Sequence, residues 1–178
     1  MNVIDEFRSG IFSLHTVRFG RVAEIMVQKL FGMENSNTLK YDKILDGERI
    51  ECKFSRALRE NEETIKPANV LESCRKANYE NRVFSSEEAE AVPFDCNIQQ
   101  VKRKEFDKLY YGIFFIDKIE IYVISAEEIF GLDNYSDKQH RGNIGEGQFH
   151  ISNGNIKYHR ERYLSAELTY EELYNLFS

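Results

Sequence analysis

A tight β-hairpin is predicted by the segment Tyr41-Asp42-Lys43-Ile44-Leu45-Asp46-Gly47-Glu48-Arg49-Ile50-Glu51-Cys52-Lys53. Asp46-Gly47 lies in its middle and favours a two-residue type I′ turn, because both central positions of that turn need a positive φ. With this turn, Leu45 lies opposite Glu48. Apolar residues at positions 50, 52 and 54 alternate with polar ones, so we expect one face of the hairpin to pack inward against helices or a second layer.

The register of this hairpin brings charged side chains together. Counting back from the turn places Asp42 opposite Glu51, and Lys40 opposite Lys53. Side chains alternate between the faces of a strand, so Asp42, Glu51 and Lys53 share one face. Cross-strand neighbours lie about 5 Å apart at Cβ, and carboxylates at that spacing can share one Mg²⁺ that keeps waters and phosphate oxygens as its other ligands. The pattern D-x8-E-x-K therefore predicts the core of a metal-dependent nuclease site.

The whole composition is that of one globular domain. The chain has 178 residues, of which 42% are hydrophobic, and we expect a single nuclease domain over residues 1–178. No apolar run approaches the ~20 residues that cross a bilayer, and the first residues lack the features of a secretory signal. We therefore expect a cytoplasmic protein that does not bind membranes. Cys52, Cys74 and Cys96 form no C-x-x-C pair, so a zinc ribbon or iron–sulfur cluster is not expected.

Hydrophobic periodicity predicts a chain that contains both helices and strands. The first helix is expected over residues 16–33, with Thr16 as N-cap and Gly32 near its end. The last is expected over residues 168–177, with a capping box of Thr169 and Glu172. Further expected elements are helices over 70–78 and 105–111, a helical turn over 126–130, strands over 94–102, 112–116 and 119–125, and a hairpin of 148–151 with 155–159. Residues 56–93 are poor in apolar side chains and predict either a DNA-facing excursion or a dimerisation arm.

The order of helix, carboxylate-bearing hairpin, strand, helix and strand resembles the common core of the PD-(D/E)XK nuclease superfamily. Within it, the chain looks most like a type II restriction endonuclease. The residues that carry the resemblance are Gly20-Arg21-Val22-Ala23-Glu24, Asp42, Glu51-Cys52-Lys53, and Ile98-Gln99-Gln100-Val101-Lys102 followed by Phe106-Asp107. Tyr41 stands where the motif of the superfamily has proline. The resemblance implies an α/β fold with a central mixed β-sheet flanked by helices. The catalytic core is then expected over about residues 16–125, and a DNA-reading region over about 133–163.

The resemblance implies a reaction and its participants. Asp42 and Glu51 would hold Mg²⁺, with Glu24 as an outer carboxylate ligand, and Lys53 would orient or help deprotonate the attacking water. The metal would lower the pKa of its bound water and neutralise developing charge. The products would carry 5′-phosphate and 3′-hydroxyl ends. The implied partners are double-stranded DNA, a second copy of the chain, because palindromic sites match two-fold symmetry, and a cognate DNA methyltransferase.

Candidate DNA-reading residues follow the expected catalytic segment. Glutamine pairs bidentately with adenine in the major groove. On a regular strand only one of Gln99 and Gln100 can face DNA, and Gln100 is favoured unless a bulge reverses the pair. The predicted DNA contacts are Gln99, Gln100, Lys102, Lys138, His140, Arg141, Asn143, Gln148, Arg160 and Arg162. Arg141, Asn143 and Gln148 suit bases, whereas Lys157, His159, Arg160 and Arg162 suit phosphates, which position the protein without specifying sequence.

Three functions stay open from the sequence. The first is a site-specific DNA endonuclease. The second is a structure-specific or repair nuclease of the same superfamily, such as a junction resolvase, and the third is a non-catalytic DNA-binding module whose carboxylates are surface charges. The net charge of −6 argues against a protein that merely coats nucleic acid, but an acidic enzyme can still line one cleft with basic groups. The amide-rich final third favours the first function.

Overall fold

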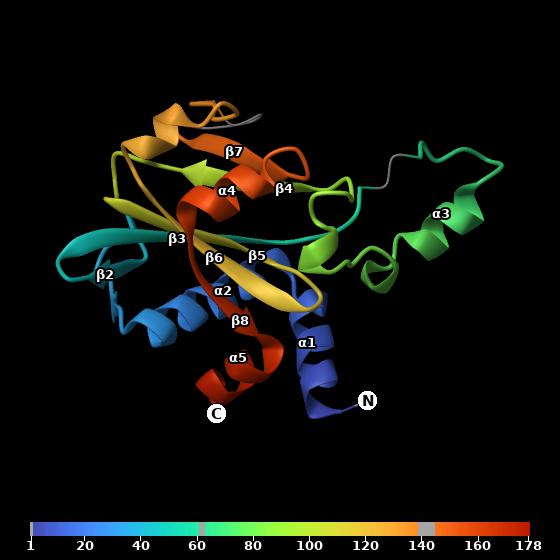
Figure 1. Ribbon diagram of the computed structural model, residues 1–178, viewed down its shortest axis with the longest axis horizontal. Helices are drawn as coiled ribbons and strands as arrows, with labels where there is room; N and C mark the ends of the chain where they lie inside the picture. Colours follow the sequence, from blue (N-terminus) through green and yellow to red (C-terminus); the bar gives the residue numbers. More distant parts are fainter. Residues whose placement is uncertain (1, 61–62, 139–144) are drawn as a thin grey trace.

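The computed structural model describes residues 2–60, 63–138 and 145–178. These residues form a mixed α/β fold with a six-stranded sheet in the order β1-β2-β3-β5-β6-β8 and a two-stranded sheet of β4 and β7 (Figure 1). The strands are β1 (Glu34–Asn35), β2 (Lys43–Leu45), β3 (Glu48–Arg56), β4 (Asp95–Val101), β5 (Lys108–Phe114), β6 (Lys118–Ser125), β7 (Gly147–Ser152) and β8 (Leu164–Thr169). The α-helices are α1 (Val3–Ser13), α2 (Thr16–Phe31), α3 (Val70–Lys76), α4 (Ile156–Tyr163) and α5 (Tyr170–Phe177).

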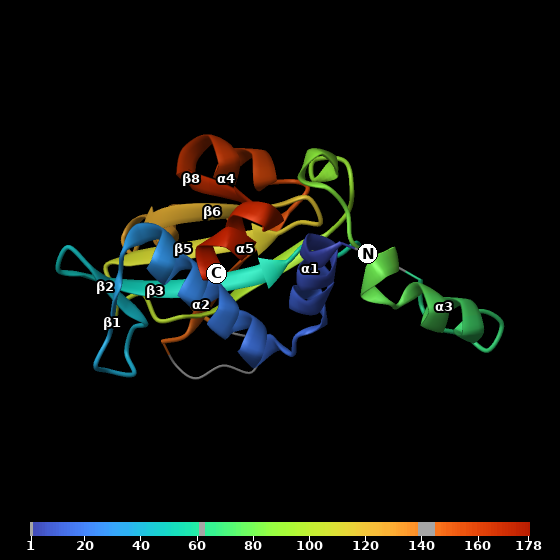
Figure 2. The ribbon, with the colours of Figure 1, turned by 90° about the horizontal axis from the view of Figure 1, so that it is seen from below.

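The large sheet is mixed and flanked by helices, as predicted. Strands β3 and β5 pair in parallel, while the pairs β1·β2, β2·β3, β5·β6 and β6·β8 are antiparallel. Helices α1, α2 and α5 cover one face of this sheet (Figure 2). Ile50 and Cys52 of β3 are buried on that face with Met26 and Val27 of α2, so the predicted apolar side of the hairpin is confirmed.

The opposite face of the large sheet packs against the β4–β7 sheet and α4. Leu109, Tyr111 and Ile113 of β5 are buried there, together with Ile98 of β4 and Phe149 of β7. Residues that pair across β3 and β5 share a face, and Glu51 pairs with Leu109 while Lys53 pairs with Tyr111. Glu51 and Lys53 therefore point into the space between the two sheets.

The predicted hairpin is confirmed in its turn and its register. Asp46 and Gly47 have φ values of 51° and 84°, as a type I′ turn requires. Leu45 pairs with Glu48, and the ladder ends where Lys43 pairs with Ile50. The expectation that Lys40 pairs with Lys53 is wrong, because β2 begins only at Lys43.

The predicted first and last helices are present, with small differences at their ends. Helix α2 begins at Thr16 and has His15 as N-cap, so Thr16 is its first residue and not its cap. Gly32 ends the helix with a φ of 68°, in the left-handed region that glycine favours. The predicted capping box of Thr169 and Glu172 is confirmed, although residue 168 belongs to β8 and α5 begins at Tyr170.

Two local predictions are wrong, because tertiary burial overrides local preference. The expected helix over 105–111 is instead a turn followed by β5, whose residues after Lys108 are all buried. A continuous apolar run suits a strand covered on both faces. The expected hairpin of 148–151 with 155–159 does not form: β7 pairs with β4, and the second segment begins helix α4. Ile156, His159 and Tyr163 are buried at helical spacing.

Helix α1 and strands β1 and β8 were not predicted, although the sequence of α1 carries a readable signal. Helix α1 begins after Asn2, whose side chain accepts a hydrogen bond from the Asp5 N–H, and its apolar residues recur at helical spacing. Strand β8 pairs with β6 at the sheet edge and has little burial pattern of its own. In the described part of the chain, no helix has the length and apolar character to cross a bilayer.

Candidate active site

Glu51 and Lys53 form a close ion pair on β3. The Lys53 Nζ lies 2.5 Å from the Glu51 Oε1, and the two side chains are 24% and 11% exposed. The two residues share a face of the strand because their positions differ by two. The parallel neighbour β5 and the overlying β4 shield this pair from most solvent, so it lies at the edge of a protein interior and not on an open surface.

Asp42 lies at the end of the hairpin ladder, across from Glu51. Its N–H donates to the Ile50 carbonyl at 2.9 Å, and its Oδ2 accepts from the Cys52 N–H at 2.9 Å. The next residue, Lys43, is buried on the helical side, where its Nζ donates to Gln28 and Asn35 at 2.9 and 2.6 Å. The main chain of β3 and the anchoring of residue 43 therefore hold the Asp42 carboxylate in a fixed place.

The electrostatics show that the three predicted side chains act on one another. Burial raises the pKa of Glu51 to about 7; Asp42 adds to the rise, while Lys53 and Lys102 oppose it. Burial alone would lower the pKa of Lys53, but Glu51 and Asp42 more than offset that effect, so its pKa lies above the ordinary value. The site thus holds a carboxylate that resists ionisation unless another cation joins it.

The donor set fits a hard divalent cation. Among residues 2–60, 63–138 and 145–178, no group of three or more His, Cys, Asp and Glu side chains is arranged to hold a metal. Mg²⁺ needs only one or two carboxylates, because it keeps waters and takes substrate phosphate oxygens as further ligands. A cation beside Asp42 and Glu51 would also relieve the repulsion and desolvation that raise the Glu51 pKa. The residues present therefore suit an open Mg²⁺ site and not a closed cage.

Glu24 is placed on the helical side of β3. It forms an ion pair with Arg21 at 2.7 Å, and its side chain is 25% exposed. Burial raises the pKa of the Cys52 thiol, and Asp42, Glu51 and Glu24 contribute to that rise in decreasing order. Glu24 is thus near the hairpin, but its contacts are with Arg21, and its role as an outer metal ligand stays a prediction.

Lys102 connects β4 to the candidate site. Its charge lowers the pKa of Glu51, and its Nζ lies 3.6 Å from a carboxylate oxygen of the largely buried Glu146. Lys102 is predicted from the sequence only as a DNA contact; its proximity to Glu51 and the position of Glu146 beside it were not predicted. The spacing of residues 51, 102 and 146 gave no signal, because their approach depends on the packing of β4–β7 over β3.

The two glutamines of β4 both face outward. The pairing of β4 with β7 shifts between Ile98 and Val101, and Gln100 has a φ of 59°. This is a β-bulge, in which one extra residue breaks the alternation of faces. Gln99 and Gln100 are consequently both exposed, and the expectation that only one of them points outward is wrong.

The other predicted DNA contacts differ from one another in their surroundings. Lys138 and Lys157 are exposed, and the Arg162 side chain is 59% exposed. The Gln148 side chain accepts a hydrogen bond from the Asn97 amide at 3.3 Å. His140, Arg141 and Asn143 lie outside the described residues.

Arg160 and His159 are engaged inside the protein. The Arg160 guanidinium donates to both carboxylate oxygens of buried Glu120, at 2.8 and 3.0 Å, and to the Ser86 carbonyl at 2.7 Å. These bonds favour a structural role, and a phosphate contact by Arg160 stays a prediction. His159 is 1% exposed and bonds to the Tyr111 hydroxyl, so its expected role at phosphates is wrong.

Comparisons with protein-family models, with characterised proteins and with solved structures found no match to this chain. The geometry of Asp42, Glu51 and Lys53 is therefore the basis of the functional proposal that follows.

Proposed function

We propose that this protein is a Mg²⁺-dependent endonuclease that hydrolyses phosphodiester bonds in double-stranded DNA at a specific short sequence. The observation that carries the proposal is the convergence of Asp42, Glu51 and Lys53 at one end of a hairpin, with Glu51 shielded enough to raise its pKa to about 7. On a solvated hairpin that merely carries surface charges, a glutamate would keep a pKa near its ordinary value. The burial of Glu51 therefore argues that it is more than a surface charge.

Each side chain has a distinct part in the proposed reaction. Asp42 and Glu51 would bind the metal, which when present lowers the pKa of bound water and neutralises charge that develops on the phosphate. The Lys53 ammonium would orient the attacking water and donate to a phosphate oxygen. The water oxygen forms a bond to phosphorus as the bond to the 3′ oxygen breaks, which leaves a 5′-phosphate and a 3′-hydroxyl. The Cys52 N–H keeps the Asp42 carboxylate in place throughout.

A finer fold assignment, to the PD-(D/E)XK core, belongs to the same proposal. Helix α2, the hairpin of β2 and β3, and the parallel strand β5 support it. The helix expected over 105–111 does not, since that segment is a turn followed by β5. The resemblance to type II restriction endonucleases now depends on the helix and the hairpin.

Sequence reading and partners complete the proposal. Gln99 and Gln100 project from β4, and Lys102, which acts on Glu51, directly follows this strand. Amides beside a scissile phosphate could pair with adenine in the major groove. A homodimer would match a palindromic target, and a methyltransferase that modifies the same target would protect the DNA of the host cell.

Digestion of a phage genome tests the proposed function. With Mg²⁺ the protein should give discrete fragments whose sequenced ends share one short motif and carry 5′-phosphates, and chelation of the metal should stop the reaction. Cutting confined to branched substrates would favour a structure-specific nuclease. Failure to cut any DNA with Mg²⁺ or Mn²⁺ would contradict a nuclease of either kind.

A further inference from the structure

An arm around α3 projects from the body of the protein (Figures 1 and 2). Within residues 63–81, all side chains are exposed except Asn69, Ser73 and Tyr79. Among the exposed ones are the apolar residues Ile65, Val70 and Leu71, which are 61%, 41% and 75% exposed. Helix α3 spans 7 residues, well below the roughly 12–15 residues at which an isolated helix becomes even marginally stable in water. Such a segment lacks the burial that would hold it, so a partner is expected to cover it.

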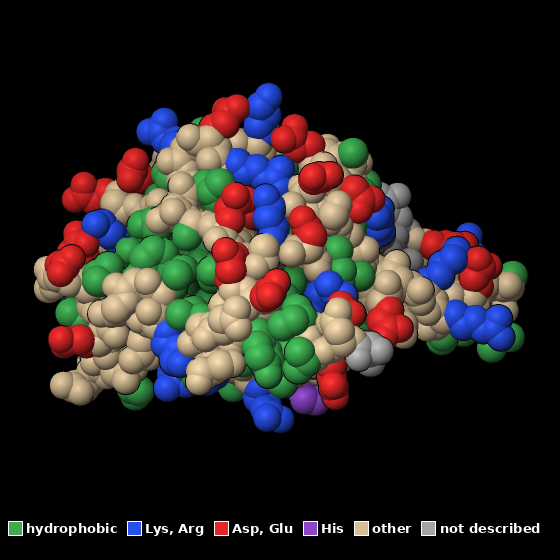
Figure 3. Space-filling model, turned by 60° about the horizontal axis from the view of Figure 1, so that its bottom comes forward, with side chains coloured by type: hydrophobic (Ala, Val, Ile, Leu, Met, Phe, Trp, Pro, Cys, Tyr) green, Lys and Arg blue, Asp and Glu red, His purple; other side chains and the backbone are tan. Residues whose placement is uncertain are grey.

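The charges of the arm indicate a protein partner and not a nucleic acid. Acidic, basic and hydrophobic side chains mix along it (Figure 3). Lys66, Arg75 and Lys76 are balanced by acidic Glu63, Glu72 and Glu80, and Lys76 is already paired with Glu72 at 2.8 Å. Surfaces that bind the DNA backbone are basic, whereas exposed aliphatic residues beside balanced charges suit a protein interface.

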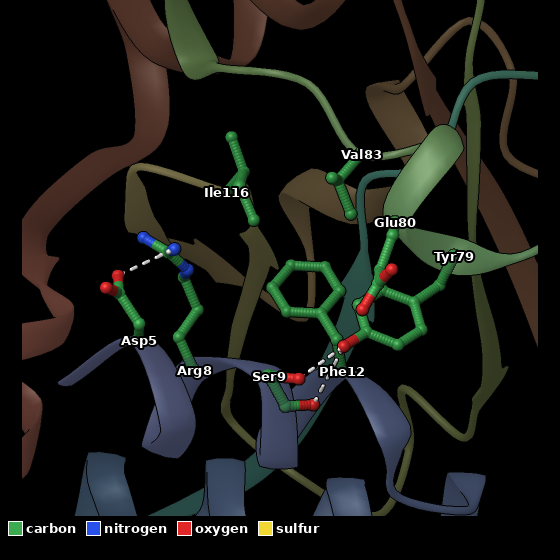
Figure 4. A pocket seen from close by; sticks show the side chains of 8 residues that line it. All are labelled: Asp5, Arg8, Ser9, Phe12, Tyr79, Glu80, Val83 and Ile116. Carbon is green, nitrogen blue, oxygen red and sulfur yellow. Dashed lines mark hydrogen bonds and ion pairs between the residues drawn. The ribbon is translucent and has the colours of Figure 1, made fainter. Parts of the chain in front are cut away.

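A hollow lies at the base of the same arm. Its volume is about 320 Å³, and Figure 4 shows its lining between α1, the end of the arm at Tyr79 and Glu80, and the turn that follows β5. Phe12, Val83 and Ile116 provide apolar walls, and the Tyr79 ring stacks on Phe12 at 5.9 Å between centroids. The Tyr79 hydroxyl is bonded to Ser9. Charged side chains also line the hollow: Asp5 and Arg8 pair with each other at 3.0 Å, and Glu80 lies beside Tyr79. The hollow thus has apolar walls, against which an incoming aliphatic side chain can pack, and a charged margin.

We propose that the arm is the contact surface of a symmetric homodimer, in which each arm places Ile65, Val70 and Leu71 in the hollow of the other copy. A two-fold interface must be self-complementary, and this chain carries, side by side, a projection with exposed aliphatic residues and a hollow whose walls are formed by Phe12, Val83 and Ile116. If the two arms run antiparallel, the exposed aliphatic residues of each arm reach the hollow at the base of the other arm. The arm and α1 together supply a number of residues of the order of the 20–30 per side that a stable interface uses.

This inference deepens the proposed function, which expects a homodimer, but it is carried by the arm and not by the catalytic site. It names where the two copies meet. Of the two interpretations that the sequence left open for residues 56–93, the proposal takes dimerisation, and a DNA-facing excursion is the alternative that the experiment below tests.

Light scattering after size-exclusion chromatography, over a range of protein concentrations, tests the dimer. The variant Leu71→Glu should have half the mass of the wild type, because a buried unpaired carboxylate is costly at an interface. Leu39→Glu is the matched control, because Leu39 is fully exposed. It precedes β2, which lies at the opposite end of the molecule from α3 in Figure 1. It should keep the dimer mass. Melting curves should show both variants folded, since neither side chain is buried.

A monomeric wild type at all concentrations up to millimolar, or a dimeric Leu71→Glu, would overturn the inference. Loss of DNA binding by Leu71→Glu without a change in mass would assign the arm to DNA and also overturn it. Glu51→Gln separates the two proposals, because it should lose cleavage and keep the dimer. A dimer that does not cut DNA would contradict the proposed function and leave the interface standing.

Discussion

At the scale of single residues, Glu51 shows how a functional group opposes stability. Its folded pKa, about 7, lies above the ordinary value of 4.5, so the folded state holds its proton more tightly than the unfolded state. The resulting stabilisation is complete below pH 4.5 and is lost as the pH rises through 7, by roughly 3 kcal/mol. At neutral pH the ionised Glu51 therefore lowers the free energy of unfolding. Such a cost is expected if the side chain serves the proposed binding of a cation.

His159 has the opposite effect on stability and provides a pH prediction. Burial lowers its pKa to about 4, and its Nδ1 is hydrogen-bonded to the Tyr111 hydroxyl at 2.8 Å. The unfolded state therefore takes up the proton first as pH falls below 6.5, and stability is lost between 6.5 and 4. Between pH 7.5 and 4.5, wild type should lose about 2.5 kcal/mol more than His159→Gln does.

Urea denaturation at the two pH values measures this difference. The control His15→Gln replaces an exposed histidine and should follow the wild type at both. An equal loss in His159→Gln and wild type would show that His159 is not held neutral by the fold.

The candidate trio could be predicted from the sequence because its geometry is local. A two-residue turn at Asp46-Gly47 fixes the register, and the register places Asp42 beside Glu51 and Lys53. The approach of Lys102 to Glu51 could not be predicted in this way. It depends on the packing of one sheet over another. The outward direction of Gln100, next to outward-facing Gln99, depends on a bulge that the local sequence does not predict.

At the scale of elements, prediction succeeded where a segment carries its own start and stop signals. Helix α2 has an apolar stripe and a terminal glycine, and α5 has its capping box. Prediction failed at β5 and α4, whose structures are set by what covers them. The run Leu109-Tyr110-Tyr111 could be helix or strand by composition, and only its position between β3 and β6 makes it a central strand.

Gly112 tests the packing of that central strand. A Cβ added there would lie 2.4 Å from the Glu120 carbonyl oxygen and 2.5 Å from the Phe54 ring. The ring can move but the backbone of β6 cannot, so Gly112→Ala should lower the free energy of unfolding by about 1–3 kcal/mol. Thermal denaturation should show this loss. The control Gly10→Ala, where nothing lies within 4 Å of the added atom, should leave stability unchanged or raise it slightly; equal behaviour of the two variants would contradict the account of this strand.

At the scale of the whole molecule, β3 serves two layers at once. Its Ile50 and Cys52 face is buried under helices, and this burial holds the strand rigid. The face of β3 that carries Glu51 and Lys53 is partly covered by β4, the strand that contains Gln99 and Gln100. The catalytic and the sequence-reading groups of the proposed enzyme therefore belong to neighbouring strands of two sheets, while the proposed dimer contact lies on a separate arm.

The most direct test of the proposed site is the rate of Mg²⁺-dependent DNA cleavage by Lys53→Ala, measured beside its affinity for the same DNA. The control Lys29→Ala removes an exposed lysine on α2, which bonds to the Leu176 carbonyl, and should cut like the wild type. We expect Lys53→Ala to bind DNA and to cut it about a hundredfold more slowly or not at all, as loss of a group that stabilises transition-state charge requires. Cleavage by Lys53→Ala at the wild-type rate would contradict the assignment of this site.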